Sequence, residues 1–137
     1  MGGRLLRRRL ILPLKSVNEI NRRLNLIEFF NKEDQLKYEI QQLLKSISDL
    51  DRLMGKLASE KISPKEVGYL RQSLANIHQI KNLLHPFAEV LAWMEPLNNL
   101  EELIQYLQNY LNEELPVNLN KGNVIFFDEI DSFYRII

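Results

Sequence analysis

The side chains that could bind a metal ion or a phosphate are few, and their spacing fits neither kind of site. His78 and His85 lie seven residues apart, on roughly one side of a predicted helix. Zinc sites combine several Cys, His or carboxylate ligands, whereas this chain has no cysteine and no second carboxylate pair at ligand spacing. Gly55-Lys56 is followed by Leu57 and preceded by no glycine-rich segment, so it does not match a phosphate-binding loop. The sequence therefore predicts no metal-binding residue and no nucleotide loop.

Acidic residues cluster near the C-terminus, at Asp128, Glu129 and Asp131. Carboxylates at the start of a helix are stabilised by the helix dipole, so we interpret this cluster as the beginning of a helix rather than a metal site. Ser, His and Asp residues occur in no arrangement typical of a catalytic triad, and no acid–base pair stands at usable spacing. We therefore predict no catalytic residue, no cofactor-binding residue and no enzymatic activity for this chain.

Four arginines near the N-terminus, Arg4, Arg7, Arg8 and Arg9, are the candidate contact residues. Residues 1–25 contain seven basic residues and one acidic residue, a net charge of +6, although the whole chain has a formal net charge of zero. Guanidinium groups bind phosphates well, but nucleic-acid recognition usually needs a larger basic surface or a reading element. Two interpretations stay open for these arginines: a solvated or interdomain face, and a phosphate-binding one.

The composition is that of a single globular domain. The chain has 137 residues, of which 45% are hydrophobic and 26% charged, and a domain of that size can bury one core. The absence of cysteine suits a reducing compartment, and no apolar run approaches the roughly 18 residues of a membrane span. We expect one domain over 1–137, in the cytoplasm and without a membrane partner.

Hydrophobic spacing at three and four residues predicts an all-α bundle of about six helices. The strongest local signal is Ser63-Pro64-Lys65-Glu66, a capping box with proline at the first helical position. A small β-hairpin is predicted over 117–127, where a turn at Lys121-Gly122-Asn123 precedes a β-prone segment. The predicted helices span 3–12, 16–30, 32–46, about 50–58, 64–84, 87–94 as a short helix or turn, and about 98–113.

Within the second predicted helix we expect Val17, Ile20, Leu24 and Ile27 to form the buried face, because they recur at helical spacing. The adjoining Leu26, Phe29 and Phe30 widen that face. Asn31 is expected to cap the following helix.

An ordered set of short segments runs over nearly the whole chain. The segments are Gly3-Arg4-Leu5-Leu6-Arg7-Arg8, Leu10, Pro13-Leu14, Ile20-Asn21-Arg22-Arg23-Leu24, Asp49-Leu50-Asp51-Arg52-Leu53, Ser63-Pro64-Lys65-Glu66, 116–125 and Glu129-Ile130-Asp131. In this order they resemble the MutS DNA mismatch-repair family. Arg9 stands where that family usually has Trp, and 124–129 is a few residues shorter than the family's loop.

The resemblance is to the first part of the family's core (lever) domain, which precedes the DNA-clamp insertion. It implies that this chain is an excerpt of a larger, dimeric ATPase that acts on mismatched duplex DNA and binds ATP and magnesium in other domains. The partners it implies are those other domains, with DNA reached through the parent protein. An exposed apolar face on such an excerpt also favours self-association.

Two functions follow as hypotheses. In the first, the chain is a structural lever segment that connects ATPase and clamp domains and has no catalysis of its own. In the second, it is a free-standing helical module that binds nucleic acid or another anionic surface through Arg4, Arg7, Arg8 and Arg9.

Overall fold

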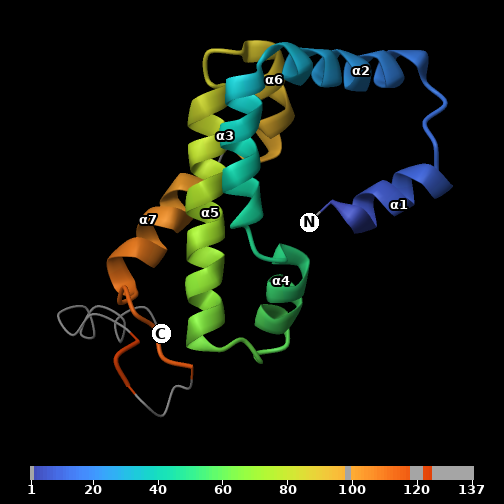
Figure 1. Ribbon diagram of the computed structural model, residues 1–137. Coiled ribbons are helices and arrows are strands. Elements are labelled where there is room, and N and C mark those ends of the chain that lie inside the picture. Colours follow the sequence, from blue (N-terminus) through green and yellow to red (C-terminus); the bar gives the residue numbers. More distant parts are fainter. Residues whose placement is uncertain (1, 98–99, 118–121, 125–137) are drawn as a thin grey trace.

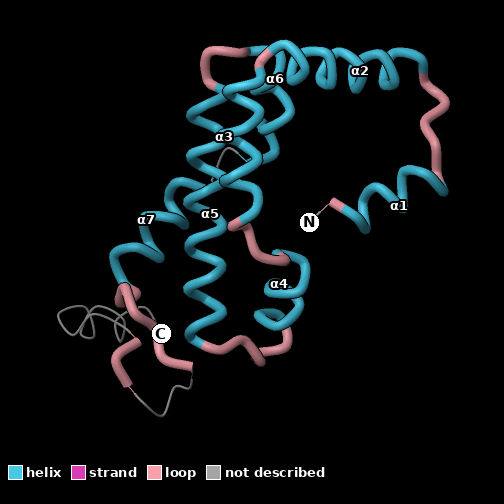
Figure 2. Tube along the Cα trace, viewed as in Figure 1, coloured by secondary structure: helices cyan, strands magenta, loops and turns pink. Residues whose placement is uncertain are grey.

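A computed structural model describes residues 2–97, 100–117 and 122–124 of the chain (Figure 1). Across these ranges the regular elements are helices and no strand is present, which confirms the all-α prediction (Figure 2). The predicted hairpin over 117–127 and the predicted helix from Asp128 lie mostly or wholly outside the described residues. The elements are α1 (Gly3–Ile11), α2 (Val17–Lys32), α3 (Asp34–Lys45), α4 (Leu50–Ala58), α5 (Pro64–Leu84), α6 (Ala88–Leu91), the 3-10 helix η1 (Ala92–Leu97) and α7 (Leu100–Tyr110).

Helix α5 is the element against which the others pack. It has 21 residues, a length of about 32 Å at 1.5 Å per residue, and it contacts α3, α4, α6 and α7. Figure 1 shows α3 lying along one half of α5, with α4 and α7 flanking it. The bundle is therefore arranged around a single continuous rod.

The start of α5 is fixed by the predicted capping box. The Ser63 hydroxyl accepts a hydrogen bond from the Glu66 amide, and the Glu66 carboxylate accepts one from the Ser63 amide at 3.0 Å. Lys56, at the end of α4, forms an ion pair with the same carboxylate. One glutamate thus caps α5 and also ties it to α4 across the short connection between the two helices.

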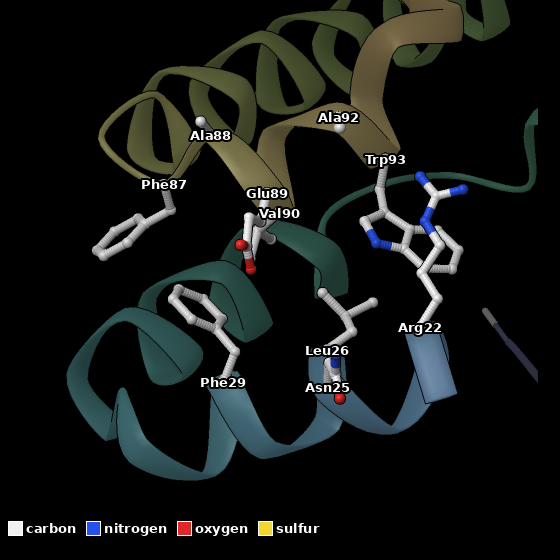
Figure 3. Close-up of a pocket in the computed structure, with 10 residues that line it drawn as sticks. All are labelled: Arg22, Asn25, Leu26, Phe29, Phe87, Ala88, Glu89, Val90, Ala92 and Trp93. Atoms are coloured by element: carbon white, nitrogen blue, oxygen red, sulfur yellow. The ribbon is translucent and has the colours of Figure 1, made fainter. Parts of the chain in front are cut away.

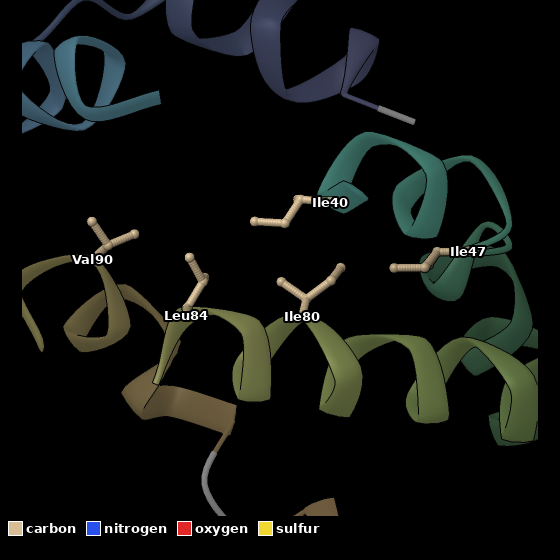
Figure 4. Close-up of a cluster of buried hydrophobic side chains, with 5 residues drawn as sticks. All are labelled: Ile40, Ile47, Ile80, Leu84 and Val90. Carbon is tan, nitrogen blue, oxygen red and sulfur yellow. The ribbon is translucent and has the colours of Figure 1, made fainter. Parts of the chain in front are cut away.

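Two apolar clusters hold the bundle together, and both include side chains of α5. The first joins α5 to the α3 side and to α6, and its buried members are Ile40, Ile47, Ile80, Leu84 and Val90 (Figure 4). The second joins α4, α5 and α7, and its buried members are Leu53, Leu70, Leu74 and Ile104. Burying such aliphatic side chains stabilises the fold by roughly 1.5–3 kcal/mol each.

Buried polar side chains of α5 bind the turn that joins α3 to α4. Ser73 is fully buried on α5, and its hydroxyl accepts a hydrogen bond from the Ser48 amide at 3.0 Å while donating one to the Tyr69 carbonyl at 2.7 Å. Asn76, 3% exposed, donates from its side-chain amide to the Ser46 hydroxyl at 2.9 Å. These bonds satisfy the polar groups of the turn, which apolar packing could not do.

Helices α1 and α2 form an arm, here defined as residues 3–32, in which α2 projects away from the bundle and α1 lies back toward α4 (Figure 1). None of its residues is buried, and α2 packs on α3. The prediction for its buried face was wrong, because Val17, Ile20, Leu24 and Ile27 are all exposed. At 100° per residue these four lie on the side of α2 opposite the residues that do pack against the first cluster, which are Leu26, Phe29 and Phe30.

The boundary between α2 and α3 also differs from the prediction. Helix α2 continues to Lys32, since the Glu33 amide still donates to the Phe29 carbonyl at 3.1 Å. Glu33, rather than Asn31, is the residue before α3, and its side chain makes no capping hydrogen bond.

We expect the Glu66 carboxylate to make the stability of the fold depend on pH. The Lys56 ammonium, followed by the Ser63 amide, lowers the pKa of the Glu66 carboxyl from 4.5 to about 2. A carboxyl whose pKa is lowered on folding stabilises the native state fully above its unfolded pKa and loses that contribution as the pH falls through its folded pKa. The substitution Glu66→Gln should therefore flatten the dependence of unfolding free energy on pH between about pH 5 and pH 2. Urea unfolding at a series of pH values measures it.

The matched control is Glu102→Gln, an exposed glutamate on α7 for which the described part of the chain offers no hydrogen bond. This variant should keep the pH dependence of the unsubstituted chain. An unchanged pH profile for Glu66→Gln would contradict the assignment of Glu66 as the group that joins α4 to α5.

Candidate interdomain surface

More than half of the exposed large apolar side chains among the described residues lie on the arm. Leu10 is 74% exposed and Val17 is 67% exposed, and a group of such side chains is more informative than a single one. On α2 the exposed members recur at helical spacing and so form one stripe along the helix. We call this set the arm surface: Leu5, Leu6, Leu10, Ile11, Leu12, Val17, Ile20, Leu24 and Ile27.

Arg4 is engaged within the chain. Its guanidinium lies 2.5 Å from the Asp49 carboxylate and 3.6 Å from that of Asp51, which joins α1 to the beginning of α4. Asp49 is also the cap of α4, and the hydrogen bond from the Arg52 amide, followed by the contact with Arg4, lowers the pKa of its carboxyl. Because these groups are largely exposed, the pair orients α1 more than it stabilises the fold.

Arg7, Arg8 and Arg9 lie on the exposed surface of α1 and pair with no group in the part of the chain that the structure describes. The four predicted contact residues are thus divided between two situations: Arg4 faces the bundle, whereas the three that follow face solvent. A cationic surface adjoins the exposed aliphatic residues of the same helix.

The arm also contacts the α6–η1 segment, which α2 faces across a pocket of about 580 Å³ (Figure 3). At one end Phe29 meets Phe87 edge to face, with ring centroids 4.9 Å apart. At the other end the Arg22 guanidinium lies over the Trp93 ring, 4.4 Å from its centroid. Leu26 lies between the two ends. The cation–π contact contributes roughly 0.5–1 kcal/mol at such a site.

The histidines singled out in the sequence occupy separate places. His78 Nδ1 lies 3.8 Å from a Glu101 carboxylate oxygen, which the Lys81 ammonium also approaches at 3.1 Å, so this group joins α5 to α7. His85 caps the far end of α5. Across the described ranges no three His, Asp or Glu side chains are grouped so as to hold a metal ion. The described helices include none that is long and apolar enough to cross a membrane.

The sequence analysis expected an exposed apolar face but did not place it on the arm, although the sequence of α2 contains a signal for that placement. Helix α2 has apolar residues on two sides, separated by polar ones, and a core-facing helix needs only one apolar stripe. The bundle covers one side of α2 and leaves the other uncovered. The described fold therefore defines a helical scaffold whose arm offers a basic and apolar face.

Comparison with known proteins assigns the family of this scaffold. A family model described as MutS domain III matches residues 1–130, and the chain belongs to that family. It is 39% identical over 127 residues to the DNA mismatch repair protein MutS of Flavobacterium johnsoniae, a match that covers 91% of this chain and 15% of that protein.

Two further relatives bear the same name, DNA mismatch repair protein MutS. The protein of Christiangramia forsetii is 39% identical over 136 residues, covering 96% of this chain and 16% of the relative. That of Syntrophomonas wolfei is 36% identical over 140 residues, covering 99% of this chain and 16% of the relative. The chain thus spans about 15% of the length of the relatives that it matches.

The arm surface predicts that the chain associates with itself as its concentration rises, because contact between apolar faces removes them from water. In sedimentation equilibrium the mean mass should exceed 16.2 kDa at high concentration. The double variant Val17→Gln/Leu24→Gln should stay closer to that value. Its matched control is Tyr38→Gln/Tyr69→Gln, which changes two exposed residues outside the arm. A monomer at every concentration, or equal association of both double variants, would contradict this role of the arm.

Proposed function

We propose that the chain is a structural lever segment of a MutS-like DNA mismatch-repair ATPase, that it connects an ATPase domain with a DNA clamp, and that it has no catalysis of its own. Membership of the MutS domain III family supports the placement in a mismatch-repair protein. ATP, magnesium and mismatched DNA are then bound elsewhere in the parent protein. Its other domains, and a second copy of the parent, are the proposed partners.

The observation that carries this proposal is the continuity of α5. A single helix of 21 residues contacts four other helices along its length, and a chain of packed side chains on a stiff element can carry a displacement from one end to the other. Its start is clamped by the capping box and by Lys56, and its end by the first apolar cluster. Such an arrangement transmits motion instead of absorbing it in a hinge.

The test is made in a full-length relative, the MutS protein of Flavobacterium johnsoniae. The positions aligned with Gln79 and Asn82, both exposed on α5, are replaced by two glycines or by two alanines. Each glycine costs about 1 kcal/mol of helix stability relative to alanine, so only the glycine pair makes α5 more flexible. We expect the stimulation of ATP turnover by mismatched duplex to fall several-fold in the glycine variant, with ATP turnover in the absence of DNA unchanged.

Equal stimulation in the glycine and alanine variants would contradict the lever proposal. ATP turnover by the isolated 137-residue chain, above that of a heat-treated sample, would contradict the proposal that it has no catalysis of its own.

The exposed arginines favour a second candidate function, binding of nucleic acid or another anionic surface through α1. Arg4 is engaged by Asp49, so the binding residues would be Arg7, Arg8 and Arg9. Binding that depends on phosphate contacts weakens steeply with salt.

For this second function, duplex DNA should bind the chain at low salt and be released as salt rises, followed by fluorescence anisotropy. The triple variant Arg7→Glu/Arg8→Glu/Arg9→Glu should bind at least about tenfold more weakly. The matched control is Lys15→Glu/Lys61→Glu/Lys65→Glu, which reverses the same number of exposed charges elsewhere. Equal loss in the two variants, or no binding at low salt, would reject this function for α1.

A further inference from the structure

Gly68 allows the side chain of Leu115, in the segment that follows α7, to lie directly against α5. A Cβ atom built on Gly68 would stand 3.0 Å from Leu115 Cδ1, closer than the roughly 3.5–4.0 Å of an optimal carbon contact, so Leu115 would have to shift. The glycine sits in the second turn of α5, where it weakens the helix relative to alanine. The advantage of a glycine at position 68 is therefore that Leu115 can approach α5 closely.

One turn further along α5, Arg71 binds the backbone of the same segment. Its Nη1 atom donates hydrogen bonds to the carbonyls of Leu111, at 2.8 Å, and Asn112, at 3.0 Å. Its Nη2 atom donates to the Glu113 carbonyl at 3.1 Å. The planar guanidinium holds five donors in a fixed fork, so it can serve several consecutive acceptors at once.

These carbonyls follow directly on the end of α7 at Tyr110. The C-terminus of a helix carries the negative end of its dipole. Arg71 thus places a positive charge just beyond the end of α7 and donates to the Leu111 carbonyl, the first after the helix, as well as to the next two. Since Lys81 pairs with Glu101 at the beginning of α7, α7 is fastened to α5 near both of its ends.

The fastened segment in turn meets a later part of the chain. The Asn112 amide donates to the Val124 carbonyl at 3.1 Å, and the Asn112 side chain donates to the Asn123 side chain at 2.9 Å. The described residues around 122–124 are therefore connected to α5 through Asn112 and the three carbonyls that Arg71 holds.

We propose that Gly68, Arg71 and Leu115 form a latch that fixes the segment following α7 to the first half of α5. A displacement of that half of α5 is then passed through the three carbonyls to Asn112 and on to Val124. The latch is the place where a displacement of α5 passes to the segment that follows α7, and in that respect it rests on the proposed lever function. Its existence as a structural device is independent of what the parent protein does.

Amide hydrogen exchange of the full 137-residue chain, read by NMR, tests the latch. Arg71→Lys keeps the positive charge but loses the planar set of donors. Exchange of the Asn112 amide should rise by about tenfold in this variant, because the segment can then move away from α5 without breaking the hydrogen bonds to the guanidinium. The amides of Ile80 and Leu84, in the first apolar cluster, should change by less than about twofold. Lys65→Ala, which removes an exposed cation from the same helix, is the matched control and should leave all three unchanged.

A second pair of variants tests the apolar half of the latch. Gly68→Val places a side chain where Leu115 lies, whereas Gly55→Val introduces the same change into α4 at a position with no atom within 4 Å. Only the first should accelerate exchange at Asn112. The proposal is overturned if Asn112 exchange is unchanged in Arg71→Lys and in Gly68→Val. It is also overturned if exchange at Ile80 and Leu84 rises equally, since that would show a general loss of stability.

These experiments are made without ATP or DNA. Their failure would therefore contradict the latch and would not bear on the lever proposal, which has a separate test. A failed coupling experiment with the glycine pair would conversely leave the latch standing as a local restraint.

Discussion

The Glu66 carboxylate meets the Ser63 amide and hydroxyl through one oxygen and the Lys56 ammonium through the other. Through these contacts it sets where α5 begins and how α4 approaches it. The rest of the bundle depends on that start, because both apolar clusters take side chains from successive turns of α5. A shift of α5 by one residue in register against its neighbours would rotate Leu70, Leu74 and Ile80 by about 100° away from their partners.

The helices packed around α5 are held by stronger contacts than the two helices of the arm. Helices α3, α4 and α7 contribute buried aliphatic side chains to the clusters. Helix α2 is held by half-buried aromatic contacts and the Arg22–Trp93 pair, and α1 is joined to α4 by the exposed Arg4 pair. Elements with few buried apolar contacts open more readily than core elements. The molecule thus combines a stiff centre with an arm whose position a neighbouring protein surface can set.

The sequence predicted the strongest local signal and the fold class correctly, whereas the weaker signal of a single candidate cap, Asn31, was wrong. The capping box at Ser63 is visible from four consecutive residues, and the all-α class follows from helical spacing. The buried side of α2 could not be chosen in the same way, because both of its sides are apolar and only the position of α3 and α6 decides between them. For Arg71, whose acceptors lie about 40 residues later, no local rule applies.

Arg71 recognises backbone carbonyls and no side chain of the segment that it holds. Any residue at positions 111 and 113 presents the same carbonyl oxygen, so substitutions there preserve the contact as long as the backbone path is kept. The arginine itself has no equivalent, because no other side chain offers this planar set of donors. The two partners of this contact therefore differ in how freely their sequences can change. Position 71 requires an arginine, whereas positions 111 and 113 require only that the backbone keep its path.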